Sequence, residues 1–300
     1  MNKKDLGKYQ SISLEEMQES LLGDLNEFDR VCKEIGCTYF LGYGTLLGAI
    51  RHDGFIPWDD DVDVWMFRKD YEKFLKEAPG KLKGNYFLQN VVTDKHFKML
   101  HVACKIRNDN TTLIEEWNKK YHQGGFIDIF PLDYVGDNPE EFFKLKKRCA
   151  FLQSLKMRIS FKELSGVKKY IRIMLQLIFK LVPARVIHNY IQSKVELVRE
   201  NDKSSNPQVT TGLDDILKDM YTKEQFFPVK YHKFGQAEFM IPNDPDAILK
   251  TLYGDYMSLP DESQRIAHGL FYGDKNYKAY EGKDDNYTTI EVNNEINLGQ

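Results

Sequence analysis

The spacing of apolar positions predicts a long amphipathic helix near the start of the chain. Apolar residues recur at intervals of three and four between Leu14 and Ile35, the period of one helix face. Ser13 and Glu16 have the spacing of a capping box, in which two side chains satisfy free backbone N–H groups of a first turn. Gly36 follows the last apolar position, so we expect the helix to end there.

Short segments rich in aromatic and β-branched residues come next and predict a sheet. CTYFLGYG is a short β-prone stretch, and alternation of polar and apolar residues predicts a strand at DVDVWMF. The following RKDYEKFLKEAP predicts a helix that Pro79 ends. Four further strands are expected at YFLQNVV, FKMLHVACKIR, TTLIEEW and GFIDIF.

The pattern becomes helical from about Asn138 to residue 200, with breaks near Gly166 and at Pro183. Helices are also expected over residues 213–227 and 244–257, with a β-like AEFMIP between them. This order of elements predicts an α/β fold with a helical insertion. We expect a core at residues 1–135, a basic helical insertion at 136–225, a C-terminal part completing the core at 226–272, and a polar tail at 273–300.

Composition narrows the class of protein. The 300 residues are 42% hydrophobic with a net charge of -3, which is typical of a folded globular chain and argues against disorder. The four cysteines form no CxxC pair, so neither a zinc site nor a disulfide framework is indicated. No apolar run follows the N-terminal lysines, and no stretch is long enough to span a membrane. We therefore expect a cytoplasmic protein.

The strongest chemical signal is a run of acids. Four of the five residues from Asp59 to Asp63 are aspartates, a density that is costly unless cations offset it. On a strand, Asp61 and Asp63 would share one face, and such hard oxygen ligands favour Mg²⁺ or Mn²⁺. An EF-hand is excluded, because Val64 and Asp70 stand where that loop requires Gly and Glu. Taken alone, the run could equally be a solvated acidic loop.

Two further features point to the same chemistry. Asp128 is a lone charge between Ile127 and Ile129, and a buried unpaired carboxylate is costly. A shared metal, or proton transfer beside the other acids, explains it best. Upstream, the glycines that bracket GYGT would let backbone N–H groups approach a phosphate, and Thr45 adds a hydroxyl.

These motifs together resemble the LicD family, the bacterial relatives of fukutin, which have the nucleotidyltransferase fold. The resemblance is carried by GTLLGAIRHDGFIPWDDDVDVWM, FIDIFPLD and PNDPDAILKTLYGDYMSLP, with Arg265 and His268 after the last segment. It covers about residues 13–135 and 226–270. It implies a nucleotidyltransferase-like mixed-sheet core.

The resemblance also implies an activity: metal-dependent transfer of phosphocholine from CDP-choline to a hydroxyl of a cell-surface glycan precursor, of teichoic acid or lipopolysaccharide type, with release of CMP. Asp61 and Asp63 would bind the metal, and Asp128 would complete the site or accept the proton of the attacking hydroxyl. The implied donor- or acceptor-binding residues are Gly44, Thr45, Arg51 and His52.

Several other residues are candidates for substrate binding. Trp58 could contribute to an aromatic cage for a quaternary ammonium. Asp59 and Asp60 either reach the metal and donor or only hold the loop. Lys105 and Arg107 alternate on one strand, so they either clamp the donor diphosphate or are edge-strand charges that face water. The match to the C-terminal family segment implies substrate contact for Arg265 and His268.

The predicted helical insertion is strongly basic. Residues 144–199 hold 14 Lys and Arg against Glu163 and Glu196, a local charge of +12. A basic helix with a broad apolar face at residues 166–190 would suit peripheral attachment to the inner face of the plasma membrane, near a lipid-linked acceptor. The alternative is a helix packed into the core with a solvated lysine edge. Nucleic-acid binding is not expected, because interleaved aromatics and a recognition motif are absent.

Two functional alternatives stay open. Another phospho-alcohol, such as glycerol, ribitol or ethanolamine phosphate, could be transferred from its CDP donor. From a different class, the chain could be a catalytically silent membrane-surface scaffold. The acceptor sugar, the number of metals and the oligomeric state are not indicated by the sequence.

Overall fold

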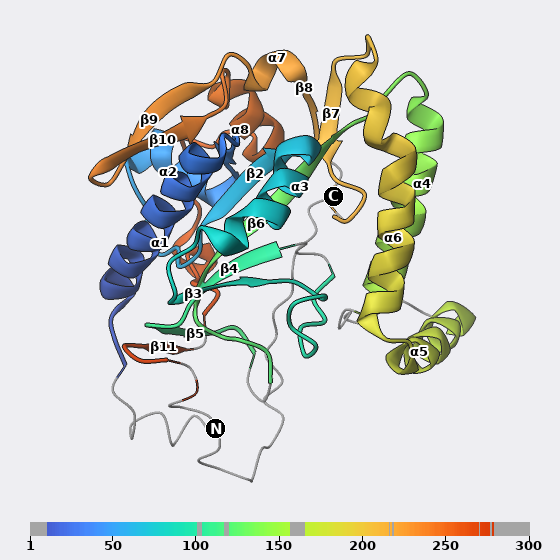
Figure 1. Ribbon diagram of the computed structural model, residues 1–300, viewed down its shortest axis with the longest axis horizontal. Coiled ribbons are helices and arrows are strands. Elements are labelled where there is room, and N and C mark those ends of the chain that lie inside the picture. The colour runs from blue at the N-terminus through green and yellow to red at the C-terminus, as the bar shows by residue number, and fades with distance from the viewer. Residues whose placement is uncertain are drawn as a thin grey trace.

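A computed structural model describes residues 11–100, 104–116, 120–156, 166–215, 217, 219–269, 271–276 and 278. A mixed sheet lies at the centre, and helices pack around it (Figure 1). The helices are α1 (Leu14–Ile35), α2 (Tyr43–His52), α3 (Arg68–Glu77), α4 (Pro139–Ser154), α5 (Gly166–Leu181), α6 (Ala184–Val198), α7 (Lys223–Phe226) and α8 (Pro245–Tyr253), with short 3₁₀ turns at Ala78–Gly80, Arg199–Lys203 and Glu262–Gln264.

Within the part of the chain that the structure describes, the strands form three sheets. The main sheet has the order β1-β2-β6-β4-β3, and β7 pairs with β6 and β8. Two-stranded sheets join β9 to β10 and β5 to β11. The bounds are β1 (Phe40–Leu41), β2 (Asp63–Phe67), β3 (Tyr86–Gln89), β4 (Cys104–Asn108), β5 (Thr112–Ile114), β6 (Gly125–Tyr134), β7 (Gln208–Thr211), β8 (Met220–Thr222), β9 (Lys230–Phe234), β10 (Ala237–Ile241) and β11 (Phe271–Gly273).

The first helix forms as predicted. Ser13 and Glu16 make both hydrogen bonds of the capping box, and Gly36 ends α1 in the left-handed conformation with φ of 65°. The apolar face of α1, including Met17, Leu21 and Phe28, is fully buried in the main core. Burial of this face, more than intrinsic helix propensity, stabilises α1.

The strand β6 organises the sheet. It pairs in parallel with β2 and antiparallel with β4, while its C-terminal end pairs with β7. Leu132 is the register partner of both Phe67 on β2 and Thr211 on β7, so β7 lies on the opposite side of β6 from β2. The sheet is therefore mixed, and the predicted α/β class is confirmed.

The predicted helical block is confirmed as three helices, α4 to α6, inserted between the paired strands β6 and β7. A second hydrophobic cluster, which includes Phe142 of α4 and Ile191 of α6, holds α4 and α6 together. Arg68 on α3 is buried between Asp133 and Asp214, with nitrogen–oxygen distances of 2.7 and 2.6 Å. This buried ion-pair network fixes the segment after β7 to the main core.

Three predictions of secondary structure were wrong in part. The expected helix over residues 213–227 is a turn, then β8, then only the short α7, because pairing of β8 with β7 outweighs local helix preference. The strands β7, β9 and β11 were not anticipated, and β7 and β8 join the core sheet from within residues 136–225. Of the expected strand at residues 97–107, residues 97–100 are not β-structure, and 101–103 lie outside the described residues.

Two negative findings concern the described residues only. None of the described helices is both long and apolar enough to cross a bilayer. The four cysteines lie in described segments, and each is buried as a free thiol. Most of the predicted tail at 273–300 lies outside the described residues; its first residue, Gly273, belongs to β11.

Candidate active site

Three neighbouring strands place Asp63, Asp128 and Lys105 side by side. Asp63 on β2 is the register partner of Asp128 on β6, and Asp128 is also the register partner of Lys105 on β4. Register partners on adjacent strands project from the same face of a sheet. Lys105 Nζ lies 2.8 Å from Asp128 Oδ1 and 2.9 Å from Glu115 Oε1. The sheet therefore presents two carboxylates beside a buried ammonium.

The loop before β2 adds further carboxylates. The sequence pattern places Asp61 on a strand with Asp63, but β2 begins at Asp63 and Asp61 lies in the preceding loop. The strand is shorter because β1 ends at Leu41, where the chain turns into α2, so Asp61 has no partner strand on that side. Side-chain ligand atoms of Asp59, Asp61 and His268 all lie within 4.8 Å of one another.

The carboxylates strongly perturb one another. Burial raises the pKa of Asp61 to about 8, and the nearby Asp59 adds to the effect. Burial raises the pKa of Asp63 well above its usual range, with contributions from Asp61 and Asp128. Burial also raises the pKa of Asp59 and of Asp128 to about 6. A bound cation would stabilise such a cluster in its ionised form.

This donor set fits a divalent cation. Asp59 and Asp61 offer hard oxygen ligands, and His268 Nδ1 lies 3.6 Å from Asp61 Oδ2. Asp128 Oδ1 is buried and accepts no hydrogen bond from any described residue, although Lys105 is close. Carboxylates without thiolates favour Mg²⁺ or Mn²⁺. The presence of His268 beside the acids was not anticipated as a metal-ligand position.

Asp60 ties the C-terminal segment to the acidic loop. Its side chain is buried and accepts hydrogen bonds from the backbone N–H of His268 (2.8 Å), the backbone N–H of Gly269 (2.5 Å) and the hydroxyl of Tyr272 (2.7 Å). His268 Nδ1 also lies 3.4 Å from Asp60 Oδ1, and this contact is the main cause that raises the pKa of His268 to about 9. Through these contacts Asp60 positions His268, and its charge also raises the pKa of Asp59 and Asp61.

The first turn of α2 borders the cluster. Thr45 Oγ1 accepts a hydrogen bond from the backbone N–H of Asp63 at 2.8 Å. A Cβ at Gly44 would lie 2.8 Å from Asp59 Oδ2, so only glycine fits without displacing that carboxylate. Gly42 caps α2 without a side-chain hydrogen bond, so the N–H groups of the first turn suit an anion. The predicted turn at GYGT is thus the start of a helix.

Arg51 and His52 lie at the other end of α2. Six residues of helix place Arg51 about 9 Å along the axis from Thr45. Arg51 Nε lies 2.9 Å from His52 Nε2, and its Nη1 donates to the carbonyl of Tyr256 at 2.8 Å. In this structure Arg51 holds the segment after α8 against α2, and His52 accepts a hydrogen bond from Arg51.

Trp58 and Arg265 contact each other. The Arg265 guanidinium lies 5.2 Å from the centre of the Trp58 ring, within the range of a cation–π interaction. Arg265 Nε also donates to the carbonyl of Pro260 at 3.0 Å. Both residues were predicted from the sequence as candidates for substrate binding, but their contact with each other was not predicted.

Lys105 and Arg107 are not edge-strand charges that face water. β4 lies between β6 and β3, and both side chains are almost fully buried. Arg107 donates to Gln89, to the carbonyl of Gly124 and to Glu115 Oε2 at 2.5 Å. Glu115 therefore bridges the two cations, a role that the sequence gave no reason to assign.

Tyr253, the last residue of α8, was also missed. Burial raises the pKa of its hydroxyl, and the negative charges of Asp63, Asp59 and Asp61 raise it further. Tyr253 therefore lies near the acidic cluster, and its side chain is 43% exposed. The YGDYM segment resembles the family pattern, which was the available signal for a site residue here.

The comparisons with known proteins decide the family. Residues 36–160 match the nucleotidyltransferase domain described as LicD/FKTN/FKRP. The chain is 30% identical over 267 residues to the lipopolysaccharide cholinephosphotransferase LicD of Haemophilus influenzae, covering 86% of this chain and 97% of that protein. This chain belongs to the LicD family.

Two partial relatives are uncharacterised proteins of Rickettsia. The Rickettsia typhi protein is 33% identical over 36% of this chain and 32% of its own length. The Rickettsia prowazekii protein is 53% identical over 36% of this chain and 38% of its own length. In this LicD-family chain the domain match contains all the clustered aspartates and Lys105, whereas His268 lies beyond residue 160.

Proposed function

We propose that this protein transfers phosphocholine from CDP-choline to a hydroxyl of a cell-surface glycan precursor and releases CMP, with Mg²⁺ or Mn²⁺ as cofactor. The observation that carries the proposal is the convergence of Asp59, Asp61, Asp63 and Asp128 beside the first turn of α2. The similarity to a lipopolysaccharide cholinephosphotransferase along 97% of its length supports the choice of phosphocholine. A cytoplasmic location is part of this proposal.

The roles follow from the geometry. Asp61 and Asp63, with Asp59 and His268 beside them, would hold the cation, which when bound neutralises charge on the donor phosphates. We assign the first turn of α2 and Thr45 to the phosphate oxygens of the donor, since this turn has no side-chain cap and borders the acids. These groups lower the barrier by positioning and electrostatics.

The acceptor hydroxyl oxygen forms a bond to the phosphorus of phosphocholine, and the bond from that phosphorus to the CMP oxygen breaks. Asp128 accepts the hydroxyl proton, and its raised pKa of about 6 suits a base near neutral pH. Lys105 orients the Asp128 carboxylate.

We assign Trp58 to recognition of the alcohol. Its contact with the guanidinium of Arg265 supports this role, because the same ring face is accessible to a cation. A quaternary ammonium is attracted to an indole ring by the same cation–π interaction, so choline would compete with Arg265 for the Trp58 ring. A glycerol or ribitol group carries no charge and would not compete with Arg265 for the ring.

The test is isothermal titration of CDP-choline, CDP-ethanolamine, CDP-glycerol and CDP-ribitol into the protein, with Mg²⁺ and with EDTA, followed by an assay of CMP release. Asp61→Asn is the test variant, and Asp137→Asn, in an exposed loop before α4, is the matched control. We expect metal-dependent binding of CDP-choline that Asp61→Asn abolishes and Asp137→Asn preserves. Preference for another CDP-alcohol would overturn the choline assignment, and binding of none would overturn the transferase.

A further inference from the structure

Helix α5 presents its most apolar face to solvent. The side chains on this face follow helical spacing, and Leu181, Val167 and Tyr170 are 86%, 73% and 72% exposed. The opposite face, which includes Arg172 and Phe179, is the partly buried one. We call the exposed set the α5 stripe; it comprises Val167, Tyr170, Ile171, Met174, Leu177, Ile178 and Leu181.

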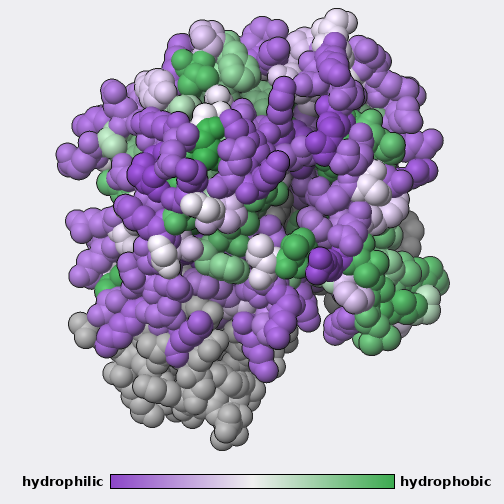
Figure 2. Space-filling view, viewed as in Figure 1, coloured by the Kyte–Doolittle hydropathy of each residue, from purple (hydrophilic) through white to green (hydrophobic). Residues whose placement is uncertain are grey.

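The position of α5 leaves this stripe accessible. Helix α5 lies at the edge of the fold, at one end of α4 and α6 and away from the main sheet (Figure 1). Figure 2 shows a patch of hydrophobic surface in the same place. Contact between Arg172 and Ser154 at 2.8 Å holds α5 against the end of α4. The expectation of a helix packed into the core with a solvated lysine edge is therefore wrong for α5.

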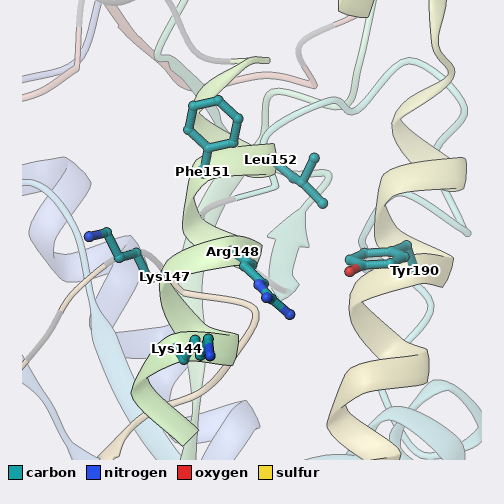
Figure 3. Close-up of a pocket in the computed structure, with 6 residues that line it drawn as sticks. All are labelled: Lys144, Lys147, Arg148, Phe151, Leu152 and Tyr190. Atoms are coloured by element: carbon teal, nitrogen blue, oxygen red, sulfur yellow. The ribbon is translucent and has the colours of Figure 1, made fainter. Parts of the chain in front are cut away.

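A groove with cationic walls lies close to this helix. It has a volume of about 490 Å³, between α4 and α6. Arg148 and Leu152 on α4 point toward Tyr190 on α6, and Lys144 and Phe151 complete the lining with Lys147 (Figure 3). Cationic and apolar groups are thus combined in one concave surface, which matches the phosphate and the acyl region of a phospholipid.

The charge around the stripe selects the partner. Residues 166–195 contain six Lys or Arg and no Asp or Glu. A second copy of this chain docking on the same surface would bring these positive charges together, which is unfavourable. An anionic bilayer satisfies both features, because lipid tails accept the stripe and headgroups attract the cations.

We propose that the α5 stripe and the groove between α4 and α6 form a membrane-binding face for anionic phospholipid surfaces. Helix α5 lies flat in the interface, with the stripe toward the acyl chains. The groove receives lipid headgroup phosphates on Lys144 and Arg148. The inference is independent of the donor that the active site uses.

The test is co-sedimentation of the full chain with vesicles of phosphatidylcholine alone and of phosphatidylcholine mixed with phosphatidylglycerol. We expect binding only to the anionic vesicles, weakened by salt. The variant Met174→Ser/Leu177→Ser/Leu181→Ser should reduce partitioning at least about tenfold. Val92→Ser/Tyr231→Ser, which changes exposed apolar residues elsewhere, is the matched control and should bind as wild type.

The proposal would be overturned if the wild type did not bind anionic vesicles, or if the control variant lost as much vesicle binding as the triple variant. It would also be overturned if light scattering showed that the wild type is a dimer and that the triple variant is a monomer. The last result would make the stripe a subunit interface. Lys144→Gln/Arg148→Gln should lose the preference for anionic vesicles, and an unchanged preference would remove the groove from the proposal. Asp61→Asn should bind vesicles normally, which separates failure here from failure of the transferase assignment.

Discussion

Lys105 and Asp128 face each other across the β4–β6 ladder, with Lys105 Nζ 2.8 Å from Asp128 Oδ1. Lys105 is almost fully buried, and its other partner is Glu115. The lysine is therefore a fixed countercharge at the inner edge of the acidic cluster. It links the strand that carries Asp128 to the Glu115–Arg107 pair on the far side.

Replacing Lys105 by Met should reduce both activity and stability. The change leaves Asp128 buried without its cation, and breaking a buried ion pair from one side costs about 3–5 kcal/mol. Loss of a group that orients a site carboxylate typically lowers activity about 10- to 100-fold. Urea denaturation and the kcat/KM of CMP release measure the two effects. Lys76→Met, at an exposed position in α3, should change neither; unchanged activity in Lys105→Met would contradict the positioning role.

Much of the fold could be predicted from local pattern. Helix α1 has its cap, period and stop residue within one stretch of sequence, so local rules suffice. The strand β7 is different, because QVTT has no distinctive alternation and forms only where β6 and β8 offer partners. The prediction of a helix at residues 213–227 was wrong for the same reason, because β8 forms only where β7 offers a partner.

The aspartates of the site could be predicted from the sequence. The position of the C-terminal segment with His268 beside them could not. Asp61, Asp63 and Asp128 stand out in sequence as clustered or isolated charges. The contact from His268 to Asp60 joins residues 208 positions apart, and no spacing rule reaches that distance. Glu115 was hidden because an acid beside a short strand is ordinarily solvated, and only the fold brings two buried cations to it.

Replacing Gly44 by Ala should impair the site. The new Cβ would meet Asp59 Oδ2 at 2.8 Å and push that carboxylate away from Asp61 and His268. We expect weaker Mg²⁺ and donor binding by isothermal titration. Gly23→Ala is a matched control on α1 with nothing within 4 Å, and it should stabilise the protein by about 0.5–1 kcal/mol without affecting binding. Equal binding by both variants would show that Asp59 is dispensable.

Substitutions of Asp60 and of Tyr272 should lower the stability of the protein by different amounts. Asp60→Ala removes the acceptor of three hydrogen bonds and leaves the N–H groups of His268 and Gly269 unsatisfied, which should cost about 3–5 kcal/mol. Tyr272→Phe removes one bond and should cost about 1–2 kcal/mol. Denaturation measures the stability, and faster amide exchange at residues 268–269 should accompany Asp60→Ala. A larger loss in Tyr272→Phe than in Asp60→Ala would contradict the tether.

Asp24 should make stability fall as pH rises. It is buried on α1, where its Oδ1 accepts hydrogen bonds from Asn108 at 2.6 Å and Tyr86 at 3.1 Å. Burial raises its pKa to about 7, above the value of 3.8 expected when unfolded. Between these values the native state holds a proton that the unfolded state has lost. The free energy of unfolding therefore decreases across this range, by about 2–4 kcal/mol.

The measurement compares wild type with Asp24→Asn by urea denaturation in EDTA at several pH values from about 4 to 8. Asn keeps an oxygen acceptor for Asn108 and Tyr86 but cannot ionise. We expect equal pH dependence from the acidic cluster in both proteins, so the difference between them isolates Asp24. The free energy of unfolding of Asp24→Asn should increase relative to that of wild type as pH rises to about 7. Above that pH the difference between the two proteins should stay constant. A pH-independent difference between Asp24→Asn and wild type would mean that Asp24 is ionised in the native state throughout this range.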